Sequence, residues 1–216
     1  MADLSVKEQI AKRVADFFED GELVNLGVGL PSIIPSFIPE NKHIWFLADN
    51  GMIGGVPLEE GEEVDPFVKD AGDNYSRLIP GGCYLSSADS FGVVRGGHLD
   101  YTVLGAMQVD GKGNIANWMV PGGKMSGMGG AMDLVTGAKQ VIVAMEHCTR
   151  DGKPKILKEC TFPLTGMNCV NWIVTELCVF KVTDKGLVLT ETAEGVTVDE
   201  IRQKTEADFT PAEGLA

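Results

Sequence analysis

The carboxylate best placed for chemistry in this sequence is Asp49, in the segment FLADNG at residues 46–51. The segment begins as an apolar strand and stops at Asp-Asn-Gly. In an α/β sheet, ligands collect beyond the carboxyl ends of the strands, which is where Asp49 would stand. Asp-Asn-Gly is also a favourable turn sequence, and taken alone these residues favour a plain turn. The segment by itself leaves a reactive carboxylate and a structural turn as alternatives.

A glycine-rich run is the second candidate for chemistry. Five glycines lie within residues 122–130, directly before an apolar segment with a helical pattern. Glycine lets backbone N–H groups approach a ligand closely, and a helix N-terminus favours negative charge. The run suits an oxyanion or phosphate site, but it matches neither a Walker A sequence nor GxGxxG after a strand. An ordered loop across the sheet edge explains the glycines equally well.

Arg95 is the third candidate, because Gly96, Gly97 and His98 follow it in a pattern that can grip an anion. A helix that ends at Arg95, with Gly96 as a left-handed cap, explains the same letters. The three histidines show no metal-ligand spacing, so no metal is expected. The five cysteines show no CxxC spacing, so reduced and mostly buried thiols are expected.

The elements that must position these residues are predicted from periodicity and turn signals. Ser5 and Glu8 predict a capping box at the start of a helix. Buried strands are expected at 22–27, 44–48, 101–110, 139–145, 170–183 and 186–192, with a hairpin turn at 110–114 and helices at 87–95, 131–138 and 197–205. Continuously apolar strands that alternate with helices predict an α/β domain with a mostly parallel sheet covered by helices on both faces. Residues 55–80 are acidic, contain Pro and Gly and are weakly periodic, so irregular surface with short elements is expected there. One domain is predicted over 1–216, with a loose tail from about 209.

The composition excludes several partners. The 31 acidic and 18 basic residues give a net charge of -13, which argues against a nucleic acid or an anionic membrane. No run approaches the ~20 apolar residues of a spanning helix. The N-terminal segment is amphipathic and carries acids, unlike a signal or transit peptide, so a cytoplasmic protein is expected.

Several segments together resemble the β subunit of family I CoA-transferases, of the 3-oxoacid or butyrate–acetoacetate (acetate) type. These segments are NLGVGLPS, DNGMIGG, RGGHLDYTVLGAMQVD, GMGGAMDLV and CTFPLTG, and the resemblance covers essentially the whole chain. It implies the three-layer fold that CoA-transferases share with sugar isomerases, and transfer of CoA from an acyl-CoA to a short-chain carboxylate. It also implies a separate α subunit and a hetero-oligomer, α2β2 or larger. Coenzyme A thioester is then a substrate, and no further cofactor is expected.

The resemblance also assigns roles to residues. The family's nucleophile is a glutamate in a Ser-Glu-Asn-Gly type sequence, and Asp49 occupies its place. The implied route is ping-pong, through an anhydride on the enzyme carboxylate and then an enzyme–CoA thioester. Asn50 and Gly51 are implied to hold the nucleophile, and the Gly129–Gly130 backbone to stabilise an oxyanion. Substrate or CoA binding is implied at Gly27, Gly29, Arg95, Gly96, Gly97, Met128 and Ala131.

Aspartate in place of glutamate is the main departure from the family. Its side chain is one methylene shorter, and a misplacement of about 1 Å can cost on the order of 10²-fold in rate. An impaired enzyme is therefore expected, either as a deliberate Glu-to-Asp variant or as a natural member with changed activity. Two other functions remain open: a catalytically silent structural or acyl-CoA-binding subunit, and another enzyme on the same fold. That enzyme would be an acyl-CoA hydrolase or a sugar-phosphate isomerase, although the sequence shows no phosphate-binding pattern for the isomerase.

Overall fold

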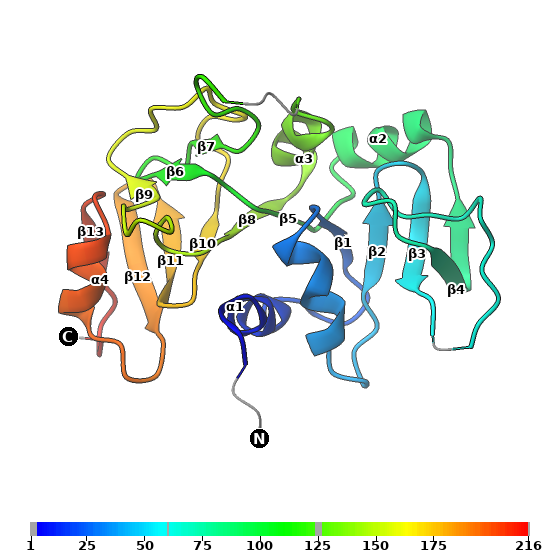
Figure 1. The fold of residues 1–216 in the computed structure, drawn as a ribbon, viewed down its shortest axis with the longest axis horizontal. Helices are drawn as coiled ribbons and strands as arrows, with labels where there is room; N and C mark the ends of the chain where they lie inside the picture. The colour runs from blue at the N-terminus through cyan, green and yellow to red at the C-terminus, as the bar shows by residue number, and fades with distance from the viewer. Residues whose placement is uncertain (1–3, 60, 124–126, 216) are drawn as a thin grey trace.

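A ten-stranded sheet runs the length of the molecule (Figure 1). The computed structural model describes residues 4–59, 61–123 and 127–215. The helices are α1 (Val6–Ala15), η1 (Leu30–Phe37, a 3-10 helix), α2 (Ser87–Arg95), α3 (Ala131–Gly137) and α4 (Val198–Lys204). The strands are β1 (Leu23–Leu26), β2 (Trp45–Ala48), β3 (Met52–Pro57), β4 (Ser76–Tyr84), β5 (Tyr101–Leu104), β6 (Gln108–Asp110), β7 (Ile115–Ala116), β8 (Gln140–Ala144), β9 (Ile156–Leu157), β10 (Trp172–Val174), β11 (Cys178–Thr183), β12 (Gly186–Thr192) and β13 (Phe209–Pro211).

The centre of the sheet is parallel. Its strand order is β13-β12-β11-β10-β8-β5-β1-β2-β3-β4, and the five strands from β10 to β2 all pair in parallel. Strands β3 and β11 pair antiparallel with both of their neighbours, so they run against the rest. The predicted mostly parallel sheet is confirmed, and it brings the carboxyl ends of β1, β2, β5 and β8 to one edge.

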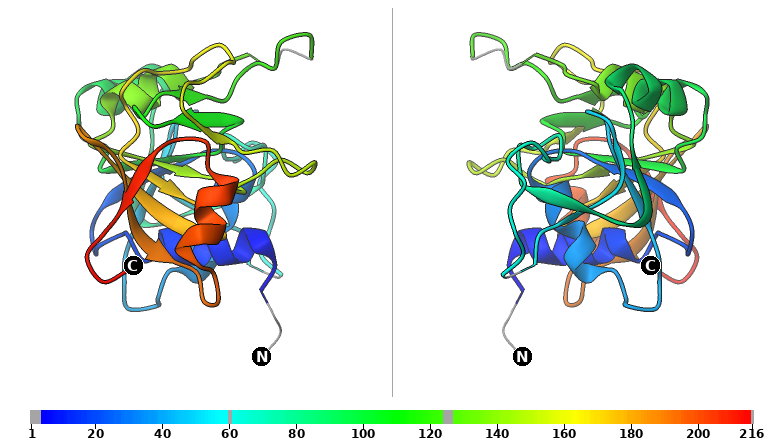
Figure 2. Two further views of the ribbon diagram at one scale, coloured as in Figure 1. Left: turned by 90° about the vertical axis from the view of Figure 1, so that its left-hand side faces the viewer. Right: turned by 90° about the vertical axis from the view of Figure 1, so that its right-hand side faces the viewer.

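Helices cover both faces of this sheet. Along β8, Val141 and Val143 face one apolar cluster, whereas Ile142 and Ala144 face the other. The first cluster contains side chains of α2 and α3, and the second contains those of α1 and η1. Figures 1 and 2 accordingly show α1 on one side of the sheet and α2 with α3 on the other. Strands β7, β6 and β9 form a second sheet, and their Val109, Ile115 and Ile156 belong to the first cluster.

Local signals fix several element ends as predicted. Ser5 Oγ accepts from the Glu8 N–H, and the Glu8 carboxylate accepts from the Ser5 N–H, so the predicted capping box is present. Helix α2 spans 87–95 as predicted. The turn at 110–114 joins the antiparallel strands β6 and β7, with Gly113 at φ 78°.

Other expectations are wrong in part. Residues 58–59 and 61–75 are irregular as expected, apart from an isolated bridge between Lys69 and Tyr75. Residues 55–57 and 76–80, however, belong to β3 and β4, which extend the sheet because ladder pairing outweighs the weak local pattern. The apolar segment 101–110 divides into β5 and β6 of different sheets, and 170–183 divides into β10 and β11.

The tail and the cysteines also differ from the expectations. The tail is ordered at 209–211, because β13 pairs with β12 and the Phe209 ring packs 5.0 Å from that of Phe180. All five thiols are free, but only Cys178 is buried.

Candidate active site

Asp49 lies in the tight turn between β2 and β3. The Gly51 N–H donates to the Ala48 carbonyl at 2.9 Å, and the Leu85 N–H donates to the Gly51 carbonyl at 2.8 Å. Gly51 has φ 122°, and a Cβ there would run into the Leu85 carbonyl oxygen. Only glycine fits this position, because both the backbone angle and the space exclude a side chain. The turn is therefore built to hold Asp49 in one place at a strand end.

The carboxylate of Asp49 reaches the glycine-rich segment before α3. A Cβ added at Gly130 would lie 2.7 Å from Asp49 Oδ2 and 2.7 Å from Cζ of Phe91 on α2. Gly130 is the N-cap residue of α3. The structure thus brings together the predicted nucleophile and one of the two predicted oxyanion glycines. Residues 124–126 of the glycine-rich run lie outside the described residues.

The environment of Asp49 shifts the pKa of its carboxyl. Burial raises the pKa of its carboxyl, while the backbone N–H groups of Asp49 and Asn50 oppose the shift. A partly desolvated carboxylate that still ionises is a stronger base and nucleophile than one in water. This is the character that attack on a thioester carbonyl requires.

Asn50 is tied to a neighbouring loop. Its side-chain amide donates to the Lys69 carbonyl at 2.9 Å. The amide therefore anchors the turn to the segment before β4. Whether Asn50 also holds the reacting carboxylate stays a prediction.

The other residues suggested by the sequence have mainly structural contacts. The Arg95 guanidinium binds the Asp133 carboxylate at 2.7 and 3.1 Å and so links α2 to α3, although the Arg95 side chain is 65% exposed. Gly96 has φ −74°, so it is not the left-handed cap; Gly97, at φ 73°, takes that conformation. An anion-binding role for these residues stays a prediction.

The remaining predicted binding residues sit at two places near the turn. The Met128 carbonyl accepts from the Ala131 N–H at 3.1 Å, which sets the approach to α3 beside Gly130. The Gly27 N–H donates to the Val103 carbonyl at 2.8 Å, and Gly29 has φ 94° where η1 begins. Gly129 has φ 53°.

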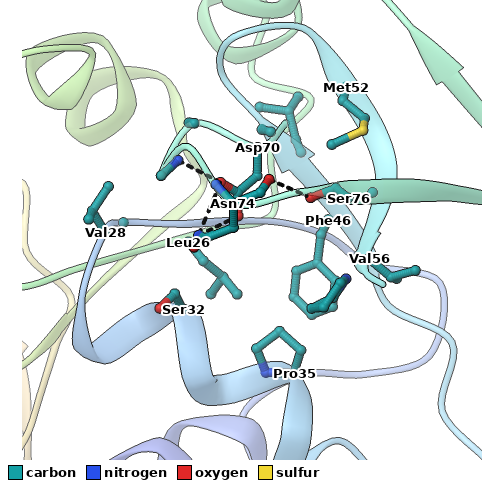
Figure 3. A pocket seen from close by; sticks show the side chains of 17 residues that line it. Leu26, Val28, Ser32, Pro35, Phe46, Met52, Val56, Asp70, Asn74 and Ser76 are labelled. Carbon is teal, nitrogen blue, oxygen red and sulfur yellow. Dashed lines mark hydrogen bonds between the residues drawn. The ribbon is translucent and has the colours of Figure 1, made fainter. Parts of the chain in front are cut away.

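A pocket of about 110 Å³ lies beside the turn, at the ends of β1 and β2 (Figure 3). Leu26, Phe46 and Val56 give it apolar walls, and Ala48 lines it directly before Asp49. Its polar edge is the segment 70–76, where Asp70 accepts from the Gly72 and Asn74 N–H groups at 2.8 and 2.9 Å. Sequence reasoning missed this segment. The sequence Asp-Ala-Gly-Asp-Asn at 70–74 predicts a turn, but no residue near it in the sequence predicts that this turn lies beside Ala48.

Within residues 4–59, 61–123 and 127–215, no group of three or more His, Cys, Asp or Glu side chains is gathered as metal ligands. In the same part of the chain, no helix is both long and apolar enough to cross a membrane.

Comparisons with known proteins identify the family of the chain. Residues 7–204 match the family model for coenzyme A transferase. The chain is 47% identical to the acetate CoA-transferase subunit beta of Escherichia coli K12, over 98% of this chain and 97% of that protein. It is 48% identical to a mouse mitochondrial succinyl-CoA:3-ketoacid coenzyme A transferase, 2B, over 97% of this chain but 41% of that protein. The apoenzyme of an acyl-CoA transferase from E. coli O157:H7 superposes on the whole chain with a TM-score of 0.77 at 22% identity, over 44% of its own length.

The chain belongs to the coenzyme A transferase family. The predicted resemblance to a CoA-transferase β subunit is confirmed, as is the predicted fold. The chain spans nearly all of the bacterial relative and about two fifths of the mouse relative.

Proposed function

We propose that this chain is the β subunit of a short-chain acyl-CoA:carboxylate CoA-transferase, with Asp49 as its nucleophile. The observation that carries the proposal is the Asp49 carboxylate lying against Gly130 at the end of β2. The names of the relatives favour acetate and 3-oxoacids as acyl groups. Butyrate belongs to the same proposal, since it has the four-carbon chain of acetoacetate, and each methylene beyond acetate changes binding by only ~1–3 kcal/mol.

The chemistry begins with attack of an Asp49 oxygen on the thioester carbonyl of the acyl-CoA. The C–S bond breaks, CoA leaves as the thiolate, and a mixed anhydride forms on Asp49. A serine would instead give an ordinary ester and lose the free energy of the thioester. The anhydride keeps that free energy in a reactive bond, so neither ATP nor a metal is required.

The thiolate then attacks the Asp49 carbonyl carbon. This step forms the enzyme–CoA thioester and releases the first carboxylate, and a second carboxylate reverses both steps. Each tetrahedral intermediate places negative charge on an oxygen, which preorganised N–H donors stabilise. The backbone at Gly129 and Gly130 is proposed as one such donor site. Coenzyme A enters as a substrate, and no other cofactor is part of the scheme.

A separate α subunit completes the proposal. Large apolar side chains remain exposed on segments that adjoin the Asp49 turn: Val28 at 73%, Tyr84 at 59% and Met128 at 38%. Exposed apolar groups around a site support a protein partner there. We propose a hetero-oligomer of α2β2 or larger that acts in the cytoplasm, and we expect this chain alone to be inactive or weak.

The test is CoA exchange between acetoacetyl-CoA and acetate by the chain co-expressed with an α subunit. We expect Asp49→Glu to raise the rate by on the order of 10²-fold, because it restores the reach of the carboxylate. Asp49→Asn removes the nucleophile and should abolish exchange. The exposed turn residue Asp184 offers a matched control, and Asp184→Glu should leave the rate unchanged.

Equal rates in the parent enzyme and in its Asp49→Glu and Asp49→Asn variants would contradict the assignment of the nucleophile. Binding of acyl-CoA without exchange, even in Asp49→Glu, would identify a silent binding subunit. Release of free acid and CoA without transfer would identify a hydrolase.

A further inference from the structure

Two buried polar side chains hold the peptide groups directly before Asp49. Asn25 on β1 is 3% exposed, and its amide donates to the Leu47 carbonyl at 3.0 Å. Ser90 on α2 is 0% exposed, and its hydroxyl donates to the Ala48 carbonyl at 3.3 Å. The last two carbonyls of β2 are therefore bound by side chains from two different elements.

Asn25 is itself fixed by a third strand. Its Oδ1 accepts from Thr102 Oγ1 at 3.0 Å, and Thr102 on β5 is 0% exposed. The register places Thr102 beside Asn25 and Asn25 beside Leu47, so the hydrogen bonds cross three adjacent strands. On its own face of the sheet, this polar network has the apolar neighbours Leu47 and Val141, which pair in register with Asn25 and Thr102.

A polar network in this position needs an explanation. Burying amide and hydroxyl groups costs free energy even when they are hydrogen-bonded, and apolar side chains are the usual choice at a sheet centre. A fully bonded polar network does, however, fix geometry more sharply than apolar packing does. The network ends at the residues directly before Asp49, where geometry matters most to a nucleophile.

We propose that Asn25, Thr102 and Ser90 are positioning residues for Asp49. They hold the β2 end rigid, so that the short aspartate side chain reaches its target in one orientation. The inference rests on the proposed function of Asp49. It adds residues that contact neither substrate nor the reacting atoms and that act through the backbone of Leu47 and Ala48.

The first variant is Ser90→Ala, which removes one hydroxyl at a buried helix position. We expect kcat to fall about 10- to 100-fold, because loss of the bond lets the turn shift by a fraction of 1 Å. KM for acyl-CoA should change less than about twofold. Ser90→Thr keeps the hydroxyl and should recover most of the rate.

The second variant tests the far end of the network. Thr102→Val preserves shape but leaves Asn25 Oδ1 without its donor, whereas Thr102→Ser keeps the donor. We expect a fall in kcat with valine and recovery with serine, although Thr102 lies two strands from Asp49. A purely structural role would lower the melting temperature without this division between kcat and KM.

Thr190→Val is the matched control. In the parent chain the Thr190 hydroxyl donates to the Val179 carbonyl at 3.2 Å. This bond lies in the β11–β12 pair, remote from β2 in the strand order. The variant should lower stability to a similar extent as Ser90→Ala and leave kcat unchanged.

Every variant is measured in the reconstituted enzyme, with Asp49 and again with Asp49→Glu. If the parent enzymes exchange CoA and Ser90→Ala falls no further in kcat than Thr190→Val, the positioning role is wrong and the proposed function stands. If neither parent exchanges CoA, the proposed function and the inference both fail.

Discussion

The Asp49 carboxylate and the Gly130 backbone are in contact across the sheet edge. Any side chain at Gly130 would begin 2.7 Å from Asp49 Oδ2 and 2.7 Å from the Phe91 ring. A side chain at Gly130 would therefore push the ends of these two side chains away, although the Gly130 backbone, at φ −83°, suits any residue. This close approach ties the β2 turn to the start of α3.

We expect Gly130→Ala to lower kcat by on the order of 10²-fold, because the added methyl group displaces the Asp49 carboxylate by about 1 Å or more. The measurement is the steady-state exchange rate of the reconstituted enzyme. Gly92→Ala on α2 is the control, since a Cβ there meets nothing within 4 Å. It should keep full activity and gain about 0.5–1 kcal/mol of stability. An active Gly130→Ala enzyme would show that the contact is not part of the reacting geometry.

The rate should depend on the ionisation of Asp49. Burial raises the pKa of this carboxyl, and only the ionised form is nucleophilic. Activity is thus present above the raised pKa and is lost as pH falls through it. In a profile of kcat/KM against pH, we expect the midpoint of the acid limb, where activity is half lost, to lie above the pKa of a free aspartate. The Asp184→Glu enzyme should give the same limb, and a limb at or below the free value would contradict the effect of burial.

Stability at mild acid should depend on His147. The ring is 0% exposed, with Nδ1 3.0 Å from Thr175 Oγ1 and Nε2 2.9 Å from Thr205 Oγ1. Burial, aided by the charges of Lys204 and Lys155, lowers its pKa to about 4. The unfolded chain binds this proton near pH 6.5. The neutral ring therefore makes its full contribution to the free energy of unfolding above about pH 6.5. This contribution, on the order of 3 kcal/mol, is lost as the pH falls toward 4.

Urea unfolding at pH 7 and at pH 4.5 measures this loss. His147→Gln does not titrate, so its stability should fall less between the two pH values than that of the parent chain. His98→Gln, at an exposed position, should behave as the parent does. Parallel losses in all three proteins would show that other groups account for the acid sensitivity.

Much of the architecture follows from local signals. The Ser5–Glu8 capping box, the helix at 87–95 and the hairpin at 110–114 are each determined by residues within a few positions of one another. Apolar strands alternating with helices define the α/β class, because both faces of a parallel sheet must be covered. The segment at 46–51 places Asp49 at a strand end, and together with other motifs it carries the family resemblance.

Pairing between distant segments could not be predicted in the same way. The acidic region 55–80, which contributes to β3 and β4, has a weak local pattern, and its strands are ordered by hydrogen bonding that starts at the edge of β2. The continuous apolar segment 101–110 divides between two sheets, which no periodicity reveals. The short tail strand β13 likewise forms because its backbone pairs with β12.

The sequence alone predicted the fold class and the position of Asp49 at a strand end, because periodicity and turn chemistry act over short stretches of chain. Its motifs, taken together, carried the family resemblance. Only the tertiary structure decided what surrounds that carboxylate. Gly130 caps α3, Ser90 lies on α2 and Asn25 lies on β1. They meet at the end of β2 because sheet register and helix packing fix contacts between residues far apart in sequence. The proposed chemistry depends on those contacts, since burial raises the pKa of the Asp49 carboxyl and rigid neighbours fix its direction.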